Sequence, residues 1–430
     1  MPPGGGRKRQ GPSQLGGAAC VENDTSQVAR FYDDREVFIT GGTGFIGKMF
    51  ERLKQEQPCA LEKVTAVAGD LSQPGLGLSA SDLATLVDNV SVVFHSGATV
   101  KFTEPIRNAF ELNVLGTRRV LDICKQMSNI RALVHVSTAY CNCDRSDVHH
   151  EAINRPSENI REYFEAFESA GNYPTDVNKE CLFGHPNTYT LTKNFAESLV
   201  LDERGNIPVA IVRPSIVTAA LKEPLPGWVD NYSACTGIVV ALGLGLLPSM
   251  ITEKKHLTDI VPVDIVANTL ICVAWHTSTR PSHVKVYHCA SGTLQQHTWG
   301  DLVDAMQKSI LRYPLPNAMC YPKFSVTNSH LWHNVNLYCL RYLPTLVADL
   351  CLTLLKREPR FVKLYKKARK SMDVGEYFLT RGWLFTMDNV VKLARDLTPK
   401  DKQASLEMDN AEIRTGNERP QMLFAIRSHS

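Results

Sequence analysis

The residues in this chain best suited to chemistry are a tyrosine and a lysine four positions apart, Tyr189 and Lys193. On a helix, two residues at this spacing lie on one face, so both side chains can reach the same bound molecule. A free phenol has a pKa of about 10, and a neighbouring ammonium is expected to lower it. Tyr189 could then give a proton to a carbonyl oxygen that receives a hydride.

A carbonyl oxygen that accepts a proton also needs a second donor to polarise it. The strand expected at residues 133–136 ends at Ser137 and Thr138, which can both supply a hydroxyl. We expect Thr138 to take this role, with Ser137 as the alternative. A Tyr/Lys pair at helical spacing also occurs in many helices for structural reasons, so the pair needs support from elsewhere in the chain.

The elements that must position these residues follow from the hydrophobic pattern. Short β-type runs alternate with longer helical ones, which predicts a parallel sheet with helices on both faces. The expected strands lie at residues 37–40, 92–95, 133–136 and 209–212, and the expected helices at residues 48–56, 188–204 and 265–275. The predicted fold class is therefore α/β, with a Rossmann-like doubly wound parallel sheet.

A glycine-rich turn follows the first expected strand, with Gly41, Gly44 and Gly47 in the spacing G-x-x-G-x-x-G. The first glycine permits a tight turn, the second lets backbone approach a pyrophosphate, and the third lets the next helix pack closely. The helix N-terminus supplies N–H groups and a favourable dipole. A strand before the turn and a helix after it are the context of a dinucleotide site. Lys193 would then hold the ribose hydroxyls, and the nicotinamide cation would help to lower the pKa of Tyr189.

Composition limits the remaining possibilities. At 430 residues the chain is long enough for two domains plus tails. A formal net charge of +3 is too small to indicate nucleic-acid binding. The 12 cysteines show no disulfide-like framework and the chain opens without a signal-peptide pattern, so we expect a reducing, cytosolic compartment. Cys141 and Cys143 form a lone C-x-C without a second pair, so no metal site is predicted.

Six segments occur in the order typical of one protein family, at residues 40–47, 94–102, 135–140, 187–193, 212–217 and 223–231. On these segments the chain resembles the fatty acyl-CoA reductases, which are extended short-chain dehydrogenases. The likeness covers residues 31–409 and includes a smaller C-terminal helical domain. It divides the chain into a tail at residues 1–30, an NADP-binding reductase domain at 31–325, the helical domain at 335–409 and a tail at 410–430.

The resemblance implies that NADPH reduces a long-chain fatty acyl-CoA to a primary alcohol. In such reductases the first hydride transfer gives a hemithioacetal, which loses coenzyme A to leave an aldehyde, and a second NADPH reduces the aldehyde. The resemblance also implies a cytoplasmic protein with peripheral attachment to the peroxisome. Two alternatives remain open: a catalytically impaired relative that acts by binding, and another extended dehydrogenase that acts on a sterol or a nucleotide sugar.

The resemblance further assigns the residues that contact the cofactor. Those at the pyrophosphate are Gly41, Thr43, Gly44, Phe45, Ile46 and Gly47. Asp70 and Leu71 would lie at the adenine, and Ala98 and Asn113 at the flanks of the cofactor. Pro214 and Ile216 would lie near the nicotinamide. Turn or capping chemistry explains Asn113 and Pro214 equally well.

One stretch departs from the family pattern. The family has a second strand, and an arginine that reads the 2′-phosphate of NADPH, between the glycine-turn helix and the Asp-Leu pair. In this chain residues 48–69 form the whole connection, with a strand expected at residues 64–68 but no second strand and arginine before it. A sheet that lacks an inner strand must close the gap or leave backbone groups unpaired. Adenine binding and the preference for NADPH depend on how this gap is resolved.

Hydrophobic segments bear on membrane contact. The longest apolar stretch, residues 234–247, falls short of the ~20 residues that span a bilayer, so we expect it in the core. Residues 346–355 are interpreted as core, with the wall of an acyl-chain site as the alternative. The basic residues 356–370 are interpreted as a solvated helix face, with contact to an anionic membrane as the alternative. Because many family members continue to a hydrophobic anchor and this chain ends in polar residues, no integral membrane span is predicted. The oligomeric state is left open.

Overall fold

The computed structural model describes residues 26–47, 58–145, 148–156, 162, 165, 182–232, 234–280, 283–316, 318–322 and 324–405. The helix expected at residues 48–56 lies outside these residues. Gly47, which precedes it, is described. Most of the expected N-terminal tail and all of the expected C-terminal tail also lie outside them. A first helix, α1 (Gln27–Tyr32), begins inside the segment expected to be tail.

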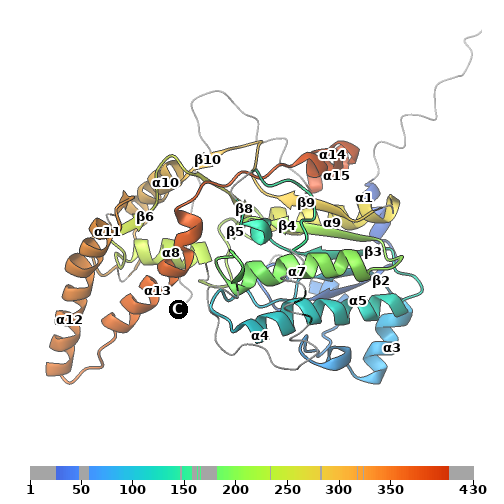
Figure 1. The fold of residues 1–430 in the computed structure, drawn as a ribbon, viewed down its shortest axis with the longest axis horizontal. Coiled ribbons are helices and arrows are strands. Elements are labelled where there is room, and N and C mark those ends of the chain that lie inside the picture. The colour runs from blue at the N-terminus through green and yellow to red at the C-terminus, as the bar shows by residue number, and fades with distance from the viewer. Residues whose placement is uncertain are drawn as a thin grey trace, which may run out of the picture.

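A five-stranded, fully parallel sheet with the strand order β1-β2-β3-β4-β9 forms the centre of the larger lobe (Figure 1). The strands are β1 (Glu36–Thr40), β2 (Val90–His95), β3 (Ala132–Val136), β4 (Val209–Pro214) and β9 (Lys285–Cys289). The first four confirm the sequence prediction, and β9 was not predicted. Every residue of β2, β3 and β4 is buried, as expected for strands covered on both faces.

Helices cover both faces of the sheet, and each set shares one hydrophobic cluster with the strands. On one face lie α3 (Ala80–Asn89), α5 (Gly116–Gln126) and α7 (Thr188–Glu203). On the other lie α1, α9 (Val263–Thr279) and α14 (Asp388–Asp396). The helix assumed at residues 188–204 is present as α7, and the helix expected at residues 265–275 is present within α9. The α/β prediction is confirmed.

The strand β1 is an edge of the sheet. Among the described residues it pairs with β2 and with no other strand, and Val37 and Ile39 are 37% and 45% exposed. Residues 64–68, expected to form a strand, are irregular and largely exposed, so that prediction was wrong. A valine-rich segment forms a strand where it finds a pairing partner and a face to bury. Within the described residues the sheet ends at β1, where open backbone groups can face water.

Short elements connect and extend the sheet. Three two-stranded sheets pair β5 (Ile216–Thr218) with β8 (Ile260–Pro262), β6 (Ser249–Ile251) with β11 (Ser325–Thr327), and β7 (Leu257–Thr258) with β10 (His297–Thr298). The remaining short helices are η2 (Pro58–Lys63), η3 (Pro74–Gly77), α4 (Ile106–Phe110), η4 (Glu111–Leu115), η5 (Ala139–Asn142) and α15 (Pro399–Ser405).

A second lobe lies beside the sheet and has its own hydrophobic cluster. Its helices are α8 (Ala234–Gly243), α10 (Trp299–Arg312), α11 (His330–Leu337), η7 (Tyr338–Tyr342), α12 (Leu343–Leu354) and α13 (Phe361–Leu379). Leu242, Leu246 and Leu247 are fully buried in this cluster, which confirms the core assignment of residues 234–247.

The helices α11, η7 and α12 form one continuous helix that runs away from the body of the protein, and α13 returns beside it (Figure 1). Most of the leucines in residues 346–355 are exposed, so the interpretation of this segment as core was wrong. His330–Leu354 is also long and apolar enough, by length and composition, to cross a membrane, and within the described residues it is the one such helix. The sequence prediction missed it because Asn, Arg and Asp interrupt the apolar run.

Candidate active site

The helix α7 places Tyr189 and Lys193 one turn apart at the carboxyl end of the sheet. Its N-cap is Asn187, whose side-chain oxygen accepts a backbone N–H of the first turn at 2.9 Å. The Lys193 side chain is buried, and its Nζ donates to the carbonyl of Val136 at 2.8 Å. Val136 is the last residue of β3, so this bond ties α7 to the strand that leads to Thr138.

Thr138 lies close enough to Tyr189 for its hydroxyl to act on the phenol and oppose the rise of its pKa. The Thr138 Oγ1 also accepts the backbone N–H of Tyr140 at 3.3 Å, which fixes its position after β3. The hydroxyl of Ser137 is buried and has no hydrogen-bond partner in the part of the chain that the structure describes. The structure therefore brings Thr138, Tyr189 and Lys193 together and favours Thr138 over Ser137 as the third hydroxyl.

Burial sets the protonation of the catalytic pair. It raises the pKa of Tyr189 above its ordinary value, and the hydrogen bond with Thr138 opposes this. This direction is the reverse of the one expected from the sequence, because the Lys193 ammonium is directed at Val136. Burial lowers the pKa of Lys193 to about 8, while the carboxylate of Glu197 acts in the opposite sense. At neutral pH the phenol is protonated, as a proton donor must be.

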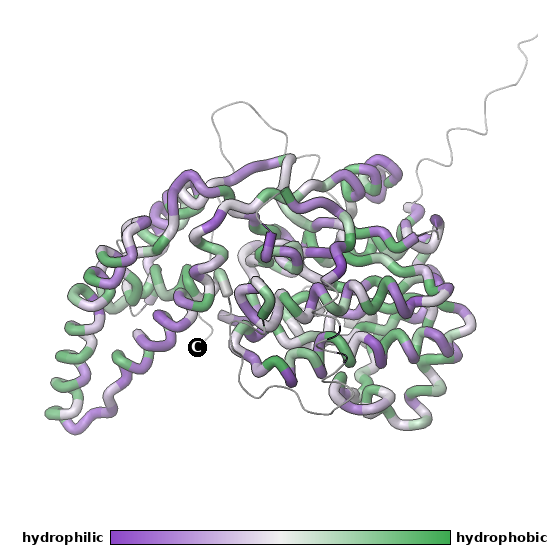
Figure 2. The backbone as a smooth tube through the Cα atoms, in the orientation of Figure 1, coloured by the Kyte–Doolittle hydropathy of each residue, from purple (hydrophilic) through white to green (hydrophobic). Residues whose placement is uncertain are grey.

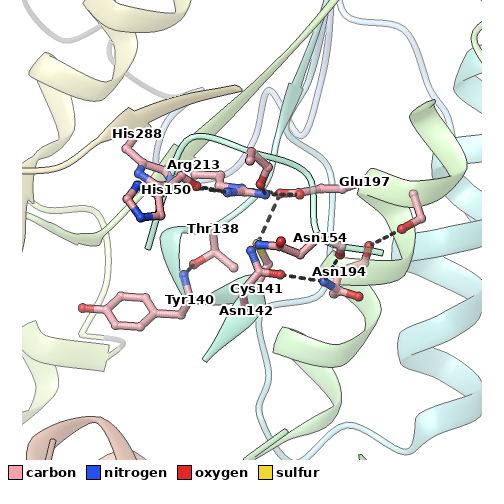
Figure 3. A network of polar contacts seen from close by, with 12 residues as sticks. Thr138, Tyr140, Cys141, Asn142, His150, Asn154, Asn194, Glu197, Arg213 and His288 are labelled. Carbon is pink, nitrogen blue, oxygen red and sulfur yellow. Dashed lines mark hydrogen bonds and ion pairs between the residues drawn. The ribbon is translucent and has the colours of Figure 1, made fainter. Parts of the chain in front are cut away.

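A buried ion pair anchors α7 on the sheet (Figure 3). Arg213 on β4 donates to Glu197 through Nε at 2.8 Å and through Nη2 at 2.5 Å, and both side chains are fully buried. The thiol of Cys141 donates to the same carboxylate at 3.3 Å. Glu197 is one turn beyond Lys193, so the ion pair fixes the rotation of the catalytic helix. Sequence reasoning missed Glu197, although a glutamate one turn after Lys193 in an apolar helix was a signal.

The two cysteines of the C-x-C motif are buried thiols. Burial raises the pKa of Cys143 to about 12 and also raises the pKa of Cys141. Within the described residues, no group of three or more His, Cys, Asp or Glu side chains is placed to hold a metal ion.

A second polar contact joins α7 to the loop after β2. The buried amide of Asn113 accepts the backbone N–H of Thr99 at 2.9 Å and donates to the Thr99 carbonyl at 3.1 Å. It also donates to the hydroxyl of Thr192 on α7 at 3.0 Å. These protein contacts favour the structural alternative for Asn113 over direct contact with a cofactor.

The glycine turn packs against the loop after β2. Gly41 has a φ of +73°, and a Cβ there would lie 2.8 Å from the backbone N of Gly97. A Cβ on Gly47 would lie 2.7 Å from Gly42. Both positions therefore require glycine, as expected. Gly44 donates its N–H to the carbonyl of Gly41 at 2.9 Å, which closes the turn.

Of the other residues assigned to the pyrophosphate, two are exposed and two pack against other side chains. Thr43 and Gly44 are exposed at the tip of the turn. The Phe45 ring stacks on Trp228 with ring centroids 5.6 Å apart, and Ile46 packs against the hydrophobic cluster below. Phe45 and Ile46 thus hold the turn in place, while Thr43 and Gly44 face solvent.

The Asp-Leu pair lies beside this turn. A Cβ on Gly97 would meet the Leu71 side chain at 2.9 Å, so Leu71 packs directly on the loop that touches Gly41. Asp70 is exposed and accepts hydrogen bonds from the N–H and the hydroxyl of Ser72, at 2.9 and 2.8 Å. These bonds lower the pKa of Asp70. Leu71 is therefore at the expected place, whereas Asp70 is engaged in its own turn.

The residues assigned near the nicotinamide lie at the carboxyl ends of the strands. Pro214 ends β4 and is buried, Ile216 begins β5, and Ala98 lies half-buried in the loop after β2. Next to Pro214, the hydroxyl of Ser215 is buried without a hydrogen-bond partner among the described residues.

These observations together fit the pyrophosphate and nicotinamide portions of a dinucleotide. The carboxyl edge of a parallel sheet is where such ligands bind. The glycine turn and the unpartnered hydroxyls of Ser137 and Ser215 all lie along this edge. On the adenosine side, β1 has no neighbouring strand within the described residues.

An aromatic cluster to which both lobes contribute packs beside the tyrosine. The ring of Phe102 stacks on Tyr189 with centroids 5.8 Å apart, and Phe378 of α13 packs on Phe102 at 5.5 Å. Phe378 also meets Tyr140 edge-to-face at 5.1 Å. The C-terminal helices therefore contribute one wall of the site. Sequence reasoning missed this wall because its residues are far apart in the chain and share no spacing.

Family models match most of the chain. A model of an NAD-binding domain, described as male sterility protein, matches residues 48–270, more than half of the chain. A second model with the same description matches residues 340–417. The chain is also 33% identical to fatty acyl-CoA reductase 1 of Xenopus laevis over 417 residues, which covers 87% of this chain and 81% of that protein. It is 31% identical to fatty acyl-CoA reductase 2 of Mus musculus, with 88% and 81% covered.

Solved structures share the fold at low sequence identity. The terminal R domain from the myxalamid PKS-NRPS biosynthetic pathway superposes with a TM-score of 0.57 at 19% identity, covering 84% of this chain and 85% of that one. The reductase domain of a non-ribosomal peptide synthetase from Mycobacterium tuberculosis superposes with a TM-score of 0.52 at 16% identity, with 84% and 85% covered. These similarities establish the reductase-type fold.

Proposed function

Because the chain belongs to the fatty acyl-CoA reductase family, we propose that it is an oxidoreductase that reduces a long-chain fatty acyl-CoA to a primary fatty alcohol. The observation that supports this most strongly is the convergence of Thr138, Tyr189 and Lys193. They meet at the carboxyl edge of the sheet, along which the glycine turn also lies.

Each residue of this group has a role that its contacts support. Tyr189 keeps its proton because burial raises its pKa, so it can donate that proton to the substrate carbonyl oxygen. Thr138, whose hydroxyl lies close to Tyr189, would donate to the same oxygen. Lys193 would hold the ribose of the nicotinamide cofactor, which supplies the hydride when bound. The ring of Phe102, which stacks on Tyr189, covers one face of the phenol.

The reaction proposed for this site has two rounds. In the first, the thioester carbonyl gains a hydride at carbon and a proton at oxygen, and the resulting hemithioacetal loses coenzyme A as a thiol to leave an aldehyde. In the second, the aldehyde gains a hydride and a proton and becomes a primary alcohol. Tyr189 would supply the oxygen-bound proton in both rounds and be reprotonated from solvent between them.

We propose NADPH as the hydride donor, as in the family pattern. The glycine turn and the carboxyl edge of the sheet support a nicotinamide dinucleotide of either kind. The open edge at β1 offers no second strand, among the described residues, to carry a residue that reads the 2′-phosphate. We therefore expect weaker discrimination between NADPH and NADH than a complete sheet would give.

The open edge at β1 also favours a second candidate, a catalytically impaired relative that acts by binding. Such a protein would keep the fold and the buried Arg213–Glu197 pair but would bind cofactor weakly. Cofactor binding separates the two candidates, because a ligand that binds the native state must raise the melting temperature.

The test is NADPH oxidation by the purified chain, with palmitoyl-CoA as the substrate and with free coenzyme A as the control. We expect oxidation that depends on palmitoyl-CoA, together with a melting temperature raised by NADPH. A folded protein that shows neither would contradict the proposal. The absence of both the turnover and the thermal shift would support the impaired relative instead.

A further inference from the structure

The helices at the far end of the second lobe form an arm, which we define as residues 330–379. It consists of one continuous helix, α11 to α12, a turn, and the returning helix α13 (Figure 1). The continuous helix has a mean hydropathy of 1.3 in its most apolar window, yet only 17% of that window is buried inside the protein. A core helix of this hydropathy would be mostly buried. Packing within the chain therefore does not explain why this helix is so apolar.

The distribution of residues on α12 is the reverse of that on an ordinary surface helix. Its buried residues are polar, namely Thr345 and Asp349. Its apolar residues face outward, with exposures of 47% for Leu346, 59% for Val347, 60% for Leu350 and 75% for Leu354. The stripe continues through the exposed residues Leu331, Trp332, Val335 and Tyr338 on the preceding turns.

The buried polar residues are explained by the hairpin itself. The carboxylate of Asp349 accepts the backbone N–H groups of Arg360, Phe361 and Val362, each at 2.9 Å. It therefore caps the N-terminus of α13 and holds the two helices together. The arm is thus a folded hairpin whose outer face is left apolar.

Exposed cations lie on the segments that follow α12, namely the turn and α13. The exposed basic residues of the turn and of α13 are Lys356, Arg357, Arg360, Lys363, Lys366, Lys367 and Lys370. Figure 2 shows the contrast between the hydrophobic colour that prevails on α12 and the hydrophilic colour of the turn and the first part of α13. An exposed apolar helix face, combined with exposed lysines and arginines in the same arm, is typical of segments that lie in the interface of an anionic membrane.

We propose that the arm docks on the surface of an anionic phospholipid bilayer. The outer face of α12 would lie at the boundary of headgroups and acyl chains, and the cations of the turn and of α13 would contact lipid phosphates. A spanning orientation would carry the charged α13 into the hydrocarbon layer, because Asp349 fastens the two helices together. A second copy of the chain would bring like charges together.

The arm connects this surface to the candidate active site. The helix α13 begins at Phe361, near the tip of the arm. Near its C-terminal end it carries Phe378, which packs on Phe102 beside Tyr189. A helix of 19 residues is roughly 28 Å long. If the proposed function holds, docking would place the site close to a membrane in which long-chain acyl substrates reside.

The test is flotation of the purified full chain with phosphatidylcholine vesicles, with and without phosphatidylserine. It needs neither cofactor nor substrate, so its outcome is independent of the proposed reductase activity. We expect binding to the phosphatidylserine vesicles that weakens at high salt. Leu350→Glu should lower the partition coefficient about tenfold or more, since it removes a leucine from the buried contact.

The matched control is Leu294→Glu, on the loop after β9, because Leu294 is 54% exposed and lies outside the arm. Binding by this variant should stay within about twofold of the wild type. Lys363→Glu should lower binding to phosphatidylserine vesicles about fivefold or more. The fluorescence of Trp332 is the part of the signal that Trp332→Phe lacks. If brominated lipids quench this part, the apolar stripe lies at the acyl chains.

Three results would overturn the proposal. One is the absence of binding to either kind of vesicle, and another is an equal loss of binding in Leu350→Glu and Leu294→Glu. The third is a dimer in solution that Leu350→Glu converts to a folded monomer, since a second copy of the chain would then cover the apolar face.

Discussion

The ring of Phe102 lies almost parallel to that of Tyr189, with an interplanar angle of 18° and centroids 5.8 Å apart. One residue comes from the loop after β2 and the other from the first turn of α7. The stacked ring shields the phenol from water, which is consistent with the raised pKa of Tyr189. The raised pKa keeps the phenol protonated at neutral pH, and this protonation leads to the first prediction.

Tyr189→Phe removes the proposed proton donor while keeping the ring that stacks on Phe102. We expect kcat for acyl-CoA reduction to fall about 10²- to 10⁴-fold. The melting temperature and its shift by NADPH should change little. A variant that unfolds, or that keeps wild-type kcat, would contradict the assignment of Tyr189.

Replacing each candidate for the third hydroxyl separates Thr138 from Ser137. Thr138→Val keeps the shape but removes the hydroxyl beside Tyr189, so kcat should fall about 10²-fold. Ser137→Ala removes a hydroxyl that has no protein partner among the described residues, and kcat should change far less. Steady-state rates on palmitoyl-CoA decide between them, and the reverse order would assign the role to Ser137.

The pH dependence follows from Lys193, whose pKa is lowered to about 8. The ammonium that would hold the cofactor ribose is present below that pH, so kcat/KM should fall as the pH rises above about 8. A rate that stays constant up to pH 10 would show that the lysine charge is not required.

The same shift affects stability with the opposite sign. The unfolded chain binds the lysine proton up to about pH 10.4, whereas the folded chain releases it near 8. The wild type should therefore gain stability relative to Lys193→Met as the pH rises through this window, by up to about 3 kcal/mol. Thermal unfolding of both proteins across the window measures the difference, and a difference that does not vary with pH would contradict the lowered pKa.

The buried pair Arg213–Glu197, which holds α7 on the sheet, should contribute strongly to the free energy of unfolding. Glu197→Gln leaves the arginine charge buried without its counter-ion, so we expect a loss of about 3–5 kcal/mol in the free energy of unfolding. The control is Glu203→Gln on the same helix, whose pair with Arg118 is partly exposed and should contribute less than about 1 kcal/mol. Denaturant unfolding measures both, and equal losses would contradict the role of the buried pair.

The sequence predicted the parts of the fold that depend on local pattern. Four strands are short apolar runs, α9 contains an apolar segment that follows a helix-start signal, and the glycine turn has the spacing that close backbone contacts require. The strand β9 was missed because Lys285, His288 and Cys289 interrupt its apolar pattern. The expected strand at residues 64–68 failed because a strand also needs a partner.

Long-range packing explains what the sequence could not predict. Phe378 joins the site through contacts with Phe102 and Tyr140, which lie more than 200 positions earlier in the chain. Residues 346–355 were interpreted as core because leucine is usually buried, whereas here the buried face of α12 is polar. Such placements depend on which helix packs beside which, and no local spacing encodes that.

The most direct measurement is the fate of deuterium carried at the transferable position of NADPH, with palmitoyl-CoA as substrate and the purified chain as catalyst. Two successive hydride transfers to one carbon predict a primary alcohol that carries two deuterium atoms at C1, and Tyr189→Phe should form almost none. An alcohol without label, or a folded protein that forms neither labelled alcohol nor labelled aldehyde, would contradict the proposed reductase activity.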